Sequence, residues 1–324
     1  MNHYHIALIT DDNYCIPTLV CIQSIIINTS PNNIYTIHIC TFGLQDENIS
    51  RFKSLSKANV NIMIDTFDGD LYKEKLKFIS QKTHVTPTAL IKFELPNYFS
   101  SIDKLLYLDG DIIVKGNIDE LLGINLYGYY LAASYEFHCR INKINYSFHR
   151  DYDDFYFNSG VMLLNLKNMR TDNITSKLWH YKINHAKTRL MDQESLNAVC
   201  GLKTLPLSLR WNFNPFFLNE KFIPEINNVY RESFSTTDKL EEDVSIVHYV
   251  GKADKPWIYT DAKMREYWDS VASLIERVLP KFNLQVYKRT NVSSIVSAKA
   301  KIKQFGLLGF VTFLINRLLK RTLQ

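Results

Sequence analysis

The chain has 324 residues, of which 46% are hydrophobic and 13% aromatic, so it can bury one large α/β core or two ordinary ones, and global disorder is excluded. Its formal net charge of +5 resides in the C-terminal segment 298–324, because the rest of the chain carries 32 basic and 33 acidic residues. A nucleic-acid-binding protein would spread its basic residues over a folded face, so no nucleic-acid partner is expected.

Strand-like and helix-like segments alternate along the first third of the chain. Period-two apolar patterns predict strands at 3–10, 34–42, 59–67 and 105–109, and helices are predicted at 16–30, 46–58 and 86–99. This alternation predicts an α/β fold with a single, mostly parallel sheet flanked by helices. In such sheets ligands bind beyond the carboxyl ends of the strands.

The rest of the chain gives a less regular pattern. Residues 136–160 are rich in polar and aromatic side chains and predict a loop-containing region, followed by a strand at 157–166 and helices within 172–200. The aromatic segment 208–240 reads as irregular, 246–251 as a strand, and 260–279 as helical. We expect a catalytic domain at 1–260, a helical extension at 261–297 and a basic tail at 298–324.

The cysteines and the first residues bear on the cellular compartment. The chain has five cysteines and no C-x-x-C pair, which predicts buried free thiols in a reducing compartment. The segment MNHYHIALIT has no basic stretch followed by an apolar one, so no secretory signal is predicted. We therefore expect a cytoplasmic protein.

The stretch LLYLDGDIIV (105–114) places two carboxylates, Asp109 and Asp111, at the end of a strand that reads as buried. Alternation directs both side chains to the same side, where they repel each other unless a cation lies between them. Mg²⁺ and Mn²⁺ accept a few carboxylates together with diphosphate oxygens. A solvated turn, with Gly110 selected for its backbone, is the alternative.

A phosphohydrolase is a second alternative, because haloacid-dehalogenase-type enzymes also carry an apolar D-x-D segment, whose first aspartate is the nucleophile. Asp109 would hold that position here. In that family the segment follows the first strand and continues as D-G-T. Here it follows three earlier strands and continues with Ile112 and Ile113, which disfavours the phosphohydrolase.

Five segments in a fixed order resemble family 8 glycosyltransferases, in particular the bacterial lipopolysaccharide and lipo-oligosaccharide α-galactosyl- and α-glucosyltransferases. They are TDDNY (10–14), LLYLDGDIIV (105–114), FNSGVMLLNL (157–166), MDQESLN (191–197) and HYVGKADKPW (248–257). The resemblance covers about residues 4–260. It implies a GT-A fold, a UDP-galactose or UDP-glucose donor, a divalent cation (Mn²⁺ or Mg²⁺), retention of anomeric configuration and a glycolipid or oligosaccharide acceptor.

The resemblance assigns metal binding to Asp109, Asp111 and His248, and a neutral imidazole beside two carboxylates suits Mn²⁺. It also implies that Gly251 lets the backbone approach the diphosphate and that Lys255 neutralises phosphate charge. Taken alone, His248 would read as a strand-end histidine and Lys255 as a surface lysine.

The nucleotide is expected at the turn after the first strand. By resemblance, Asp11 accepts the uracil N–H, and Tyr14 offers an aromatic face to the base beside Asn13. The same Asp-Asp-Asn pattern is also common in turns and helix N-caps, which is the alternative.

By resemblance, the donor sugar is held by Asn158, Ser159, Asp192 and Gln193, with Asp192 and Gln193 as the catalytic pair. Asp192 would accept hydrogen bonds from sugar hydroxyls, and Gln193 would lie near the reacting face of the anomeric carbon. A helix N-terminus favouring acidic residues is the alternative for Asp192. The family has an amide where a retaining enzyme would place a nucleophilic carboxylate, so we expect a front-face transfer.

Two positions depart from the family pattern. Lys92 stands where many bacterial members have Arg, so the cation is kept but bidentate geometry is lost. Glu136 stands where galactosyltransferases often have Asp, and one added methylene affects which epimer fits. Both departures leave open whether the donor carries galactose or glucose. The acceptor pocket is expected near His84, Phe213, Asn214 and Pro215, with core packing as the alternative for this aromatic segment.

The tail 298–324 has six basic and no acidic residues around the apolar stretch 305–315. That stretch is too short for a bilayer, which needs about 20 residues. Basic residues flanking Phe and Leu fit an interfacial helix on an anionic inner-membrane surface. We therefore expect a peripheral protein on the inner face of the cytoplasmic membrane. Packing on the catalytic domain is the alternative, and Gly306 and Gly309 weaken the helix prediction.

Overall fold

The computed structural model describes residues 1–77, 87–141, 155–185, 191–251 and 255–278. His84 and the tail 298–324 lie outside these residues, as do the central part of segment 136–160 and most of the extension 261–297. The strands in the described part of the chain are β1 (His3–Ile9), β2 (Ile34–Thr41), β3 (Val60–Thr66), β4 (Lys104–Leu108), β5 (Ile112–Val114), β6 (Leu131–Tyr135), β7 (Phe157–Asn165), β8 (Thr204–Pro206) and β9 (Ile246–His248).

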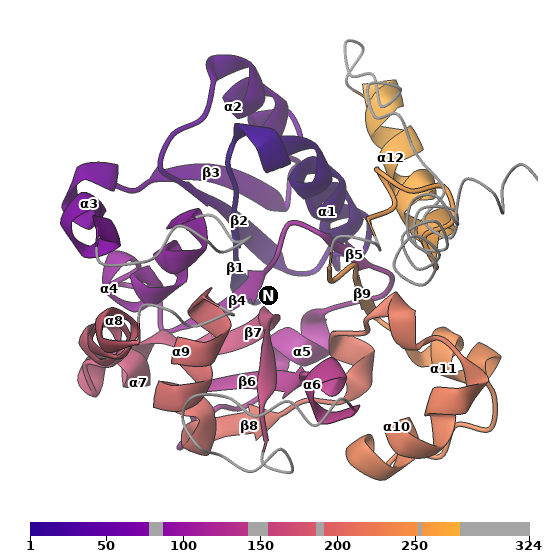
Figure 1. Cartoon of the computed structure of the whole chain (residues 1–324). Helices are drawn as coiled ribbons and strands as arrows, with labels where there is room; N and C mark the ends of the chain where they lie inside the picture. The colour runs from indigo at the N-terminus through magenta and orange to yellow at the C-terminus, as the bar shows by residue number, and fades with distance from the viewer. Residues whose placement is uncertain (78–86, 142–154, 186–190, 252–254, 279–324) are drawn as a thin grey trace, which may run out of the picture.

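Seven of these strands form one sheet in the order β3-β2-β1-β4-β7-β6-β8 (Figure 1). The strands β3, β2, β1 and β4 are mutually parallel, β7 runs antiparallel to both β4 and β6, and β8 is parallel to β6. The predicted mostly parallel central sheet flanked by helices is confirmed. The antiparallel insertion of β7 brings the segment FNSGV against the end of β4, which matters for the site.

Helices and 3₁₀ turns cover the sheet. The α-helices are α1 (Cys15–Ile27), α2 (Asp46–Lys53), α3 (Gly69–Lys77), α4 (Leu95–Tyr98), α5 (Asp119–Gly123), α6 (Phe137–Ile141), α7 (Leu166–Thr171), α8 (Ile174–Asn184), α9 (Met191–Cys200), α10 (Ile223–Tyr230), α11 (Thr237–Asp243) and α12 (Arg265–Val278). The 3₁₀ helices are η1 (Asp12–Tyr14), η2 (Pro87–Phe93), η3 (Gly201–Lys203), η4 (Leu209–Trp211), η5 (Pro215–Phe217) and η6 (Glu220–Phe222).

Alternate residues of the central strands pack into two separate cores. In β4, Leu106 and Leu108 belong to a cluster with α1, α2 and α12, whereas Leu105 and Tyr107 belong to a cluster with η2, α8 and α9. Figure 1 shows α1 and α12 together on one side of the molecule and α8 with α9 on the other. Both faces of the sheet are therefore covered, which explains why its strands are nearly continuous apolar runs. Asp109 lies two residues after Tyr107, so its side chain is on the same face of the sheet, the face covered by η2 and α9.

The predicted helix at 86–99 is wrong in detail. In the described residues this segment is η2 followed by the single turn α4, with Pro96 in the first turn of α4. Proline has no amide hydrogen to donate to the preceding turn, so a helix starts at it more readily than it passes through it. Strand β6 was also not predicted, because its sequence LAASY is short and weakly patterned.

A second, two-stranded sheet was not predicted and positions part of the site. Strand β5 pairs antiparallel with β9, and Ile112 lies opposite His248. The Asn212–Asn214 segment joins the other edge of β9, with the Phe213 amide donating to the Ile246 carbonyl at 3.0 Å. This pairing ties the residues after the D-x-D to a strand from far along the chain.

Among the described residues, no helix is both long enough and apolar enough to cross a bilayer. Helix α12 packs on α1, and Trp268, Val271 and Ile275 share its hydrophobic cluster. The start of the predicted extension is thus packed on the sheet's helical layer. All five cysteines are free and buried, as predicted.

Candidate active site

Two backbone contacts hold the D-x-D turn. The Asp109 amide donates to the Gly160 carbonyl of β7 at 2.8 Å, which extends the β4–β7 pairing by one residue. The Asp111 carbonyl accepts from the Tyr249 amide at 3.0 Å, immediately before β5 pairs with β9. The turn is therefore anchored to both sheets, and the backbone of each aspartate is fixed in position.

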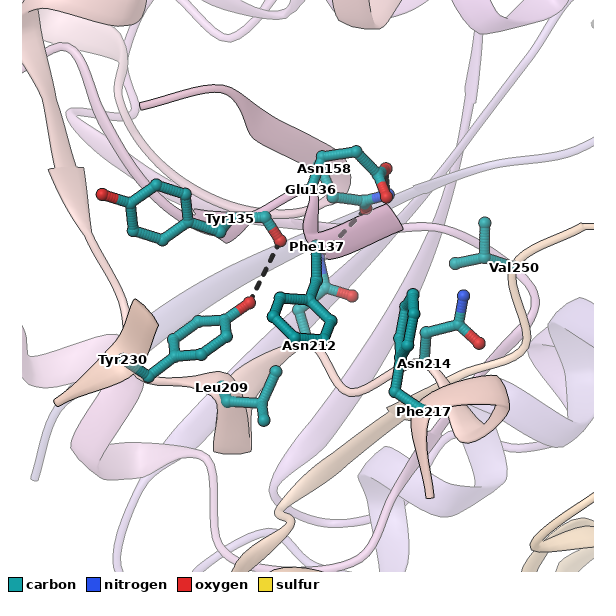
Figure 2. A pocket seen from close by; sticks show the side chains of 10 residues that line it. All are labelled: Tyr135, Glu136, Phe137, Asn158, Leu209, Asn212, Asn214, Phe217, Tyr230 and Val250. Atoms are coloured by element: carbon teal, nitrogen blue, oxygen red, sulfur yellow. Dashed lines mark hydrogen bonds between the residues drawn. The ribbon is translucent and has the colours of Figure 1, made fainter. Parts of the chain in front are cut away.

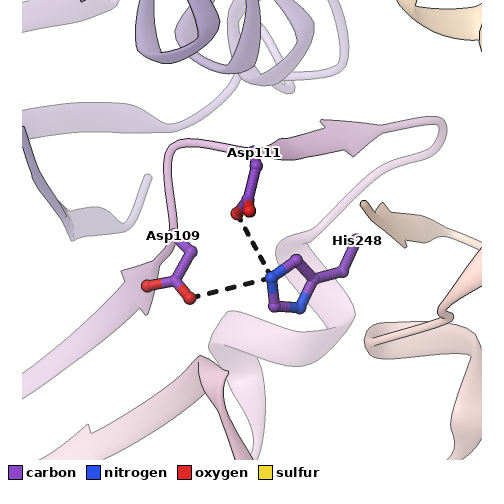
Figure 3. Close-up of side chains that lie close together, drawn as sticks. All are labelled: Asp109, Asp111 and His248. Carbon is purple, nitrogen blue, oxygen red and sulfur yellow. Dashed lines mark ion pairs between the residues drawn. The ribbon is translucent and has the colours of Figure 1, made fainter. Parts of the chain in front are cut away.

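The side chains of Asp109, Asp111 and His248 converge on one point (Figure 3). The His248 Nε2 atom lies 3.2 Å from Asp111 Oδ1 and 3.7 Å from Asp109 Oδ2. One ligand atom from each residue lies within 4.8 Å of the other two. Metal bonds of about 2.0–2.2 Å place neighbouring ligand atoms about 3 Å apart, so the three donors fit one divalent ion. The structure thus brings together the three predicted metal ligands.

The second oxygen of Asp109 is held away from this point. Asp109 Oδ1 accepts from the Tyr107 hydroxyl at 2.6 Å and pairs with Lys92 Nζ at 3.2 Å. Burial and the Asp109 charge raise the pKa of the Tyr107 hydroxyl well above its usual value, so it remains a donor. These contacts fix the carboxylate so that Oδ2 faces His248.

Asp111 is arranged in the same way. Its Oδ2 accepts from the Tyr14 hydroxyl at 3.3 Å and from the Lys255 ammonium, which also donates to the Tyr249 carbonyl at 2.6 Å. Burial alone would raise the pKa of the Asp111 carboxyl, but the adjoining Lys255 and His248 outweigh burial and hold that pKa well below its usual range. Asp111 therefore stays ionised, with Oδ1 facing His248.

The orientation of His248 is set by an amide. His248 Nδ1 lies 2.9 Å from Asn212 Oδ1, while Asn212 Nδ2 donates to Asn158 Oδ1 at 3.0 Å. Because the Asn212 oxygen faces Nδ1, the ring is turned so that Nε2 faces the two carboxylates. Metal-binding histidines are commonly fixed by a partner of this kind on the opposite nitrogen.

Gly160 leaves the space that this imidazole occupies. A Cβ at this position would lie 2.1 Å from His248 Cε1 and 2.8 Å from Asp109 Oδ2. Every other residue type would therefore displace a member of the triad. Gly110 is similarly confined, because its Cβ would lie 2.5 Å from Thr18 Oγ1.

Lys92 links the triad to the residues predicted to hold the sugar. It is only 5% exposed, and its ammonium contacts Asp192 Oδ2 at 2.7 Å, Asp109 Oδ1 at 3.2 Å and the Ser159 carbonyl at 3.3 Å. Burial lowers the pKa of Lys92, but Asp109 and Asp192 raise it more, to about 12. The lysine is thus a permanent countercharge inside the site.

Ser159 joins Asp192 and Gln193 of α9 to β7. Its hydroxyl donates to Asp192 Oδ2 at 3.0 Å, and its amide donates to Gln193 Oε1 at 3.1 Å. Glu136 closes the group, because Glu136 Oε2 accepts from Asn158 Nδ2 at 2.7 Å and from Gln193 Nε2 at 3.3 Å. The structure therefore brings all the predicted sugar-binding residues into one connected network beside the triad.

A small pocket, open to solvent, adjoins this network (Figure 2). Aromatic rings form part of its wall, and carboxylate and amide groups line the side toward the network. The lining residues are Tyr135, Glu136, Phe137, Asn158, Leu209, Asn212, Asn214, Phe217, Tyr230 and Val250. Rings beside hydrogen-bonding groups suit a ligand with one apolar and one polar face, as a sugar has.

The residues predicted around the acceptor separate in the structure. Asn214 lines this pocket, but Phe213 is fully buried in the core and Pro215 is also buried. The alternative of core packing is therefore correct for Phe213. Its backbone is bonded to one edge of β9, through Ile246 and His248, and its ring lies in the hydrophobic core.

The residues predicted to bind the nucleotide lie in and near the 3₁₀ helix η1. Asp11 caps η1 by accepting from the Tyr14 amide at 3.0 Å, so the N-cap interpretation of its side chain holds. Asn13 is exposed. The Tyr14 ring packs edge-on against Trp257, and Gly251 has a φ of +88° that favours glycine. Contact of these residues with a nucleotide stays a prediction.

Three residues of the site were not identified from the sequence: Tyr107, Gly160 and Asn212. Tyr107 precedes Asp109 by two positions on the same strand face, which was a usable signal. Gly160 stands within FNSGV, where a strand-interior glycine indicates close approach of another group. Asn212 gave no signal, because only the pairing of its segment with β9 brings it to His248.

Comparisons with known proteins agree with this geometry. Residues 5–261 match the model of glycosyl transferase family 8. The chain is 29% identical to the lipopolysaccharide 1,2-glucosyltransferase of Escherichia coli over 259 residues, covering 76% of this chain and 71% of that one. It is 26% identical to the lipopolysaccharide 1,3-galactosyltransferase of Salmonella typhimurium over 263 residues, covering 78% and 73%.

A solved structure has the same fold. The galactosyltransferase LgtC, in complex with donor and acceptor sugar analogues, superposes with a TM-score of 0.66 at 23% identity, covering 83% of this chain and 95% of that chain. This likeness identifies the architecture as the GT-A fold. Nothing in these comparisons favours the phosphohydrolase, and the D-x-D follows the fourth strand of the chain and not the first. The chain belongs to glycosyl transferase family 8 and is a glycosyltransferase.

Proposed function

We propose that the protein transfers a hexose, galactose or glucose, from a UDP-sugar to a lipopolysaccharide, lipo-oligosaccharide or related cell-surface glycan, with retention of configuration. The observation that carries the proposal is the convergence of Asp109 Oδ2, Asp111 Oδ1 and His248 Nε2, with their other polar atoms held by neighbours. Two carboxylates and an imidazole in this arrangement suit a divalent cation, which can also bind the oxygens of a sugar diphosphate. The names of the two lipopolysaccharide hexosyltransferases support the substrate class.

Asp109, Asp111 and His248 would hold Mn²⁺ or Mg²⁺, and the imidazole favours Mn²⁺. When bound, the ion supplies charge stabilisation to the diphosphate leaving group. Lys255 and the Gly251 backbone would bind the same diphosphate. The uridine would lie toward Asp11, Asn13 and Tyr14 at the carboxyl end of β1, where ligands bind in sheets of this type.

The sugar would lie between α9 and β7. Asp192, fixed by Lys92 and Ser159, would accept hydrogen bonds from its hydroxyls, and Glu136 and Asn158 would border its other side. In the transfer, the bond between the anomeric carbon and the phosphate oxygen breaks, and the acceptor oxygen bonds to the same face. The acceptor proton passes to the departing phosphate.

Gln193 would sit beside that face. Its carbonyl accepts from the Ser159 amide and its amino group donates to Glu136, so the carboxamide is held rigidly. An amide is a poor nucleophile, but the dipole of its carbonyl can stabilise a positively charged sugar. This supports a front-face transfer and argues against a covalent intermediate on Gln193.

The test is a donor screen read by release of UDP. With Mn²⁺ present, we expect turnover of UDP-galactose or UDP-glucose, with little turnover of UDP-N-acetylglucosamine. Chelation should abolish turnover, and Mn²⁺ should restore it. Undiminished turnover in protein shown to be metal-free would refute the metal site. Hydrolysis of phosphomonoesters with no UDP-sugar turnover would favour the phosphohydrolase instead.

We also propose that the tail 298–324 holds the enzyme on the anionic inner face of the cytoplasmic membrane, where a lipid-linked acceptor is assembled. The tail's basic residues are Lys299, Lys301, Lys303, Arg317, Lys320 and Arg321. Each basic residue near an anionic surface contributes about 1 kcal/mol.

Flotation with liposomes tests this proposal. The intact chain should float with vesicles containing phosphatidylglycerol, and a 1–297 truncation should remain at the bottom. Binding should weaken as salt rises, because the attraction is screened within about 10 Å at 0.1 M. Vesicles of phosphatidylcholine alone serve as the control. Equal flotation of both chains would count against a role for the tail.

A further inference from the structure

Each carboxylate of the triad is paired with one lysine, but the two lysines differ. Lys92 is held by Asp109, Asp192 and Ser159, with a side chain only 4% exposed. Lys255 has a side chain 13% exposed and contacts only Asp111 and the Tyr249 carbonyl among the hydrogen bonds found in the described residues. Its four-carbon stem can carry the ammonium elsewhere without moving the backbone.

Lysine charges offset most of the carboxylate charge around the triad in the absence of ligand. Lys92 is shared between Asp109 and Asp192, and Lys255 is bonded to Asp111, so two ammonium groups face three carboxylates. A free divalent cation therefore approaches a site whose negative charge is mostly offset, and one of its ligands, Asp111, is already bonded to an ammonium. Like charges a few ångströms apart in a partly buried site repel strongly.

A diphosphate changes this balance. Its oxygens carry negative charge and attract an ammonium at least as well as a carboxylate does. If Lys255 moves to the phosphate, Asp111 is released to the ion at the same moment as the phosphate oxygens complete the ion's shell. Binding of the nucleotide and of the ion would each remove an obstacle to the other.

We propose that Lys255 is a placeholder cation: it occupies Asp111 in the nucleotide-free protein, suppresses binding of the free metal ion, and transfers to the diphosphate when metal and nucleotide arrive together. This inference rests on the proposed function, because it assumes the triad binds a metal ion. It adds that Lys255 sets the coupling between the two ligands, beyond its contact with phosphate.

The experiment measures Mn²⁺ binding directly, from the electron paramagnetic resonance signal of the free ion, with and without UDP. Without UDP, Lys255→Met should bind Mn²⁺ about tenfold more tightly than the wild type, since one nearby positive charge is removed. The factor by which UDP tightens Mn²⁺ binding should fall by a similar amount. By thermodynamic reciprocity, Mn²⁺ should tighten UDP binding by the same reduced factor.

Two further variants sharpen the result. Lys255→Arg keeps the charge and should resemble the wild type without UDP. Lys239→Met makes the same chemical change in an exposed Lys239–Glu242 pair and should alter neither measurement. Unchanged or weaker Mn²⁺ binding by Lys255→Met without UDP, while the wild type binds Mn²⁺ with UDP, would overturn the placeholder. Absence of Mn²⁺ binding in all variants with UDP would overturn the metal site itself.

Discussion

Replacing Asp109 or Asp111 by asparagine is expected to reduce sugar transfer on the order of a thousandfold, because charge stabilisation by a bound metal is worth several kcal/mol. The amide keeps the shape of the side chain but removes the negative charge that faces His248. The measurement is UDP release from the preferred UDP-sugar with Mn²⁺, together with Mn²⁺ affinity.

The fold should survive both changes. An asparagine carbonyl can still accept from Tyr107 at position 109 or from Tyr14 and Lys255 at position 111, so a thermal melt should show a cooperative transition near that of the wild type. Asp103→Asn, at an exposed carboxylate paired with Arg170, is the matched control and should retain activity. Wild-type turnover by either site variant would remove the basis of the proposed function.

Gly160→Ala is expected to lower activity about a hundredfold through geometry alone, because displacing a catalytic group by about 1 Å has an effect of this size. The added methyl would lie 2.1 Å from His248 Cε1, so the imidazole must turn away from the carboxylates. No charge, donor or acceptor is removed, which separates this test from the aspartate variants. Activity and Mn²⁺ affinity should fall together.

Overpacking of this kind costs about 1–3 kcal/mol, so the variant should fold with a lowered melting temperature. Gly116→Ala is the control, because its Cβ would meet only Ser245 Oγ at 3.8 Å, an ordinary contact. It should keep both activity and stability. Retained Mn²⁺ affinity in Gly160→Ala would mean that His248 is not a ligand, even if the two aspartates are.

The contacts of Lys92 and Glu136 bear on the choice of donor sugar. The Lys92 ammonium lies between the carboxylates of Asp109 and Asp192 and is 4.6 Å from the centre of the Tyr107 ring. A compact ammonium can contact both carboxylates in this space. Glu136 reaches both Asn158 and Gln193 with one oxygen. A shorter aspartate would not span both contacts from the same backbone position. The choice of donor epimer is therefore expected to depend on this network.

Several features of the protein were determined by the sequence alone. The alternation of apolar segments specified a mostly parallel sheet, because strand and helix periods are local properties of the chain. The sequence also put Asp109 and Asp111 at the carboxyl end of a buried strand, where a pair of like charges needs a cation. The chain turns at residues 110–111, so the predicted strand alternation is not what directs the two side chains. Order and spacing of the five segments carried the family resemblance.

Other features were decided only by the tertiary structure. His248 reaches the carboxylates because β9 pairs with β5, and Asn212 reaches His248 because its segment pairs with β9. Both strands are three residues long and carry almost no local signal. Contacts between distant segments also decide whether Lys92 is an exposed charge or a buried countercharge. The same holds for whether Gly160 faces solvent or an imidazole. Local propensity cannot encode these contacts, since they exist only once the chain has packed.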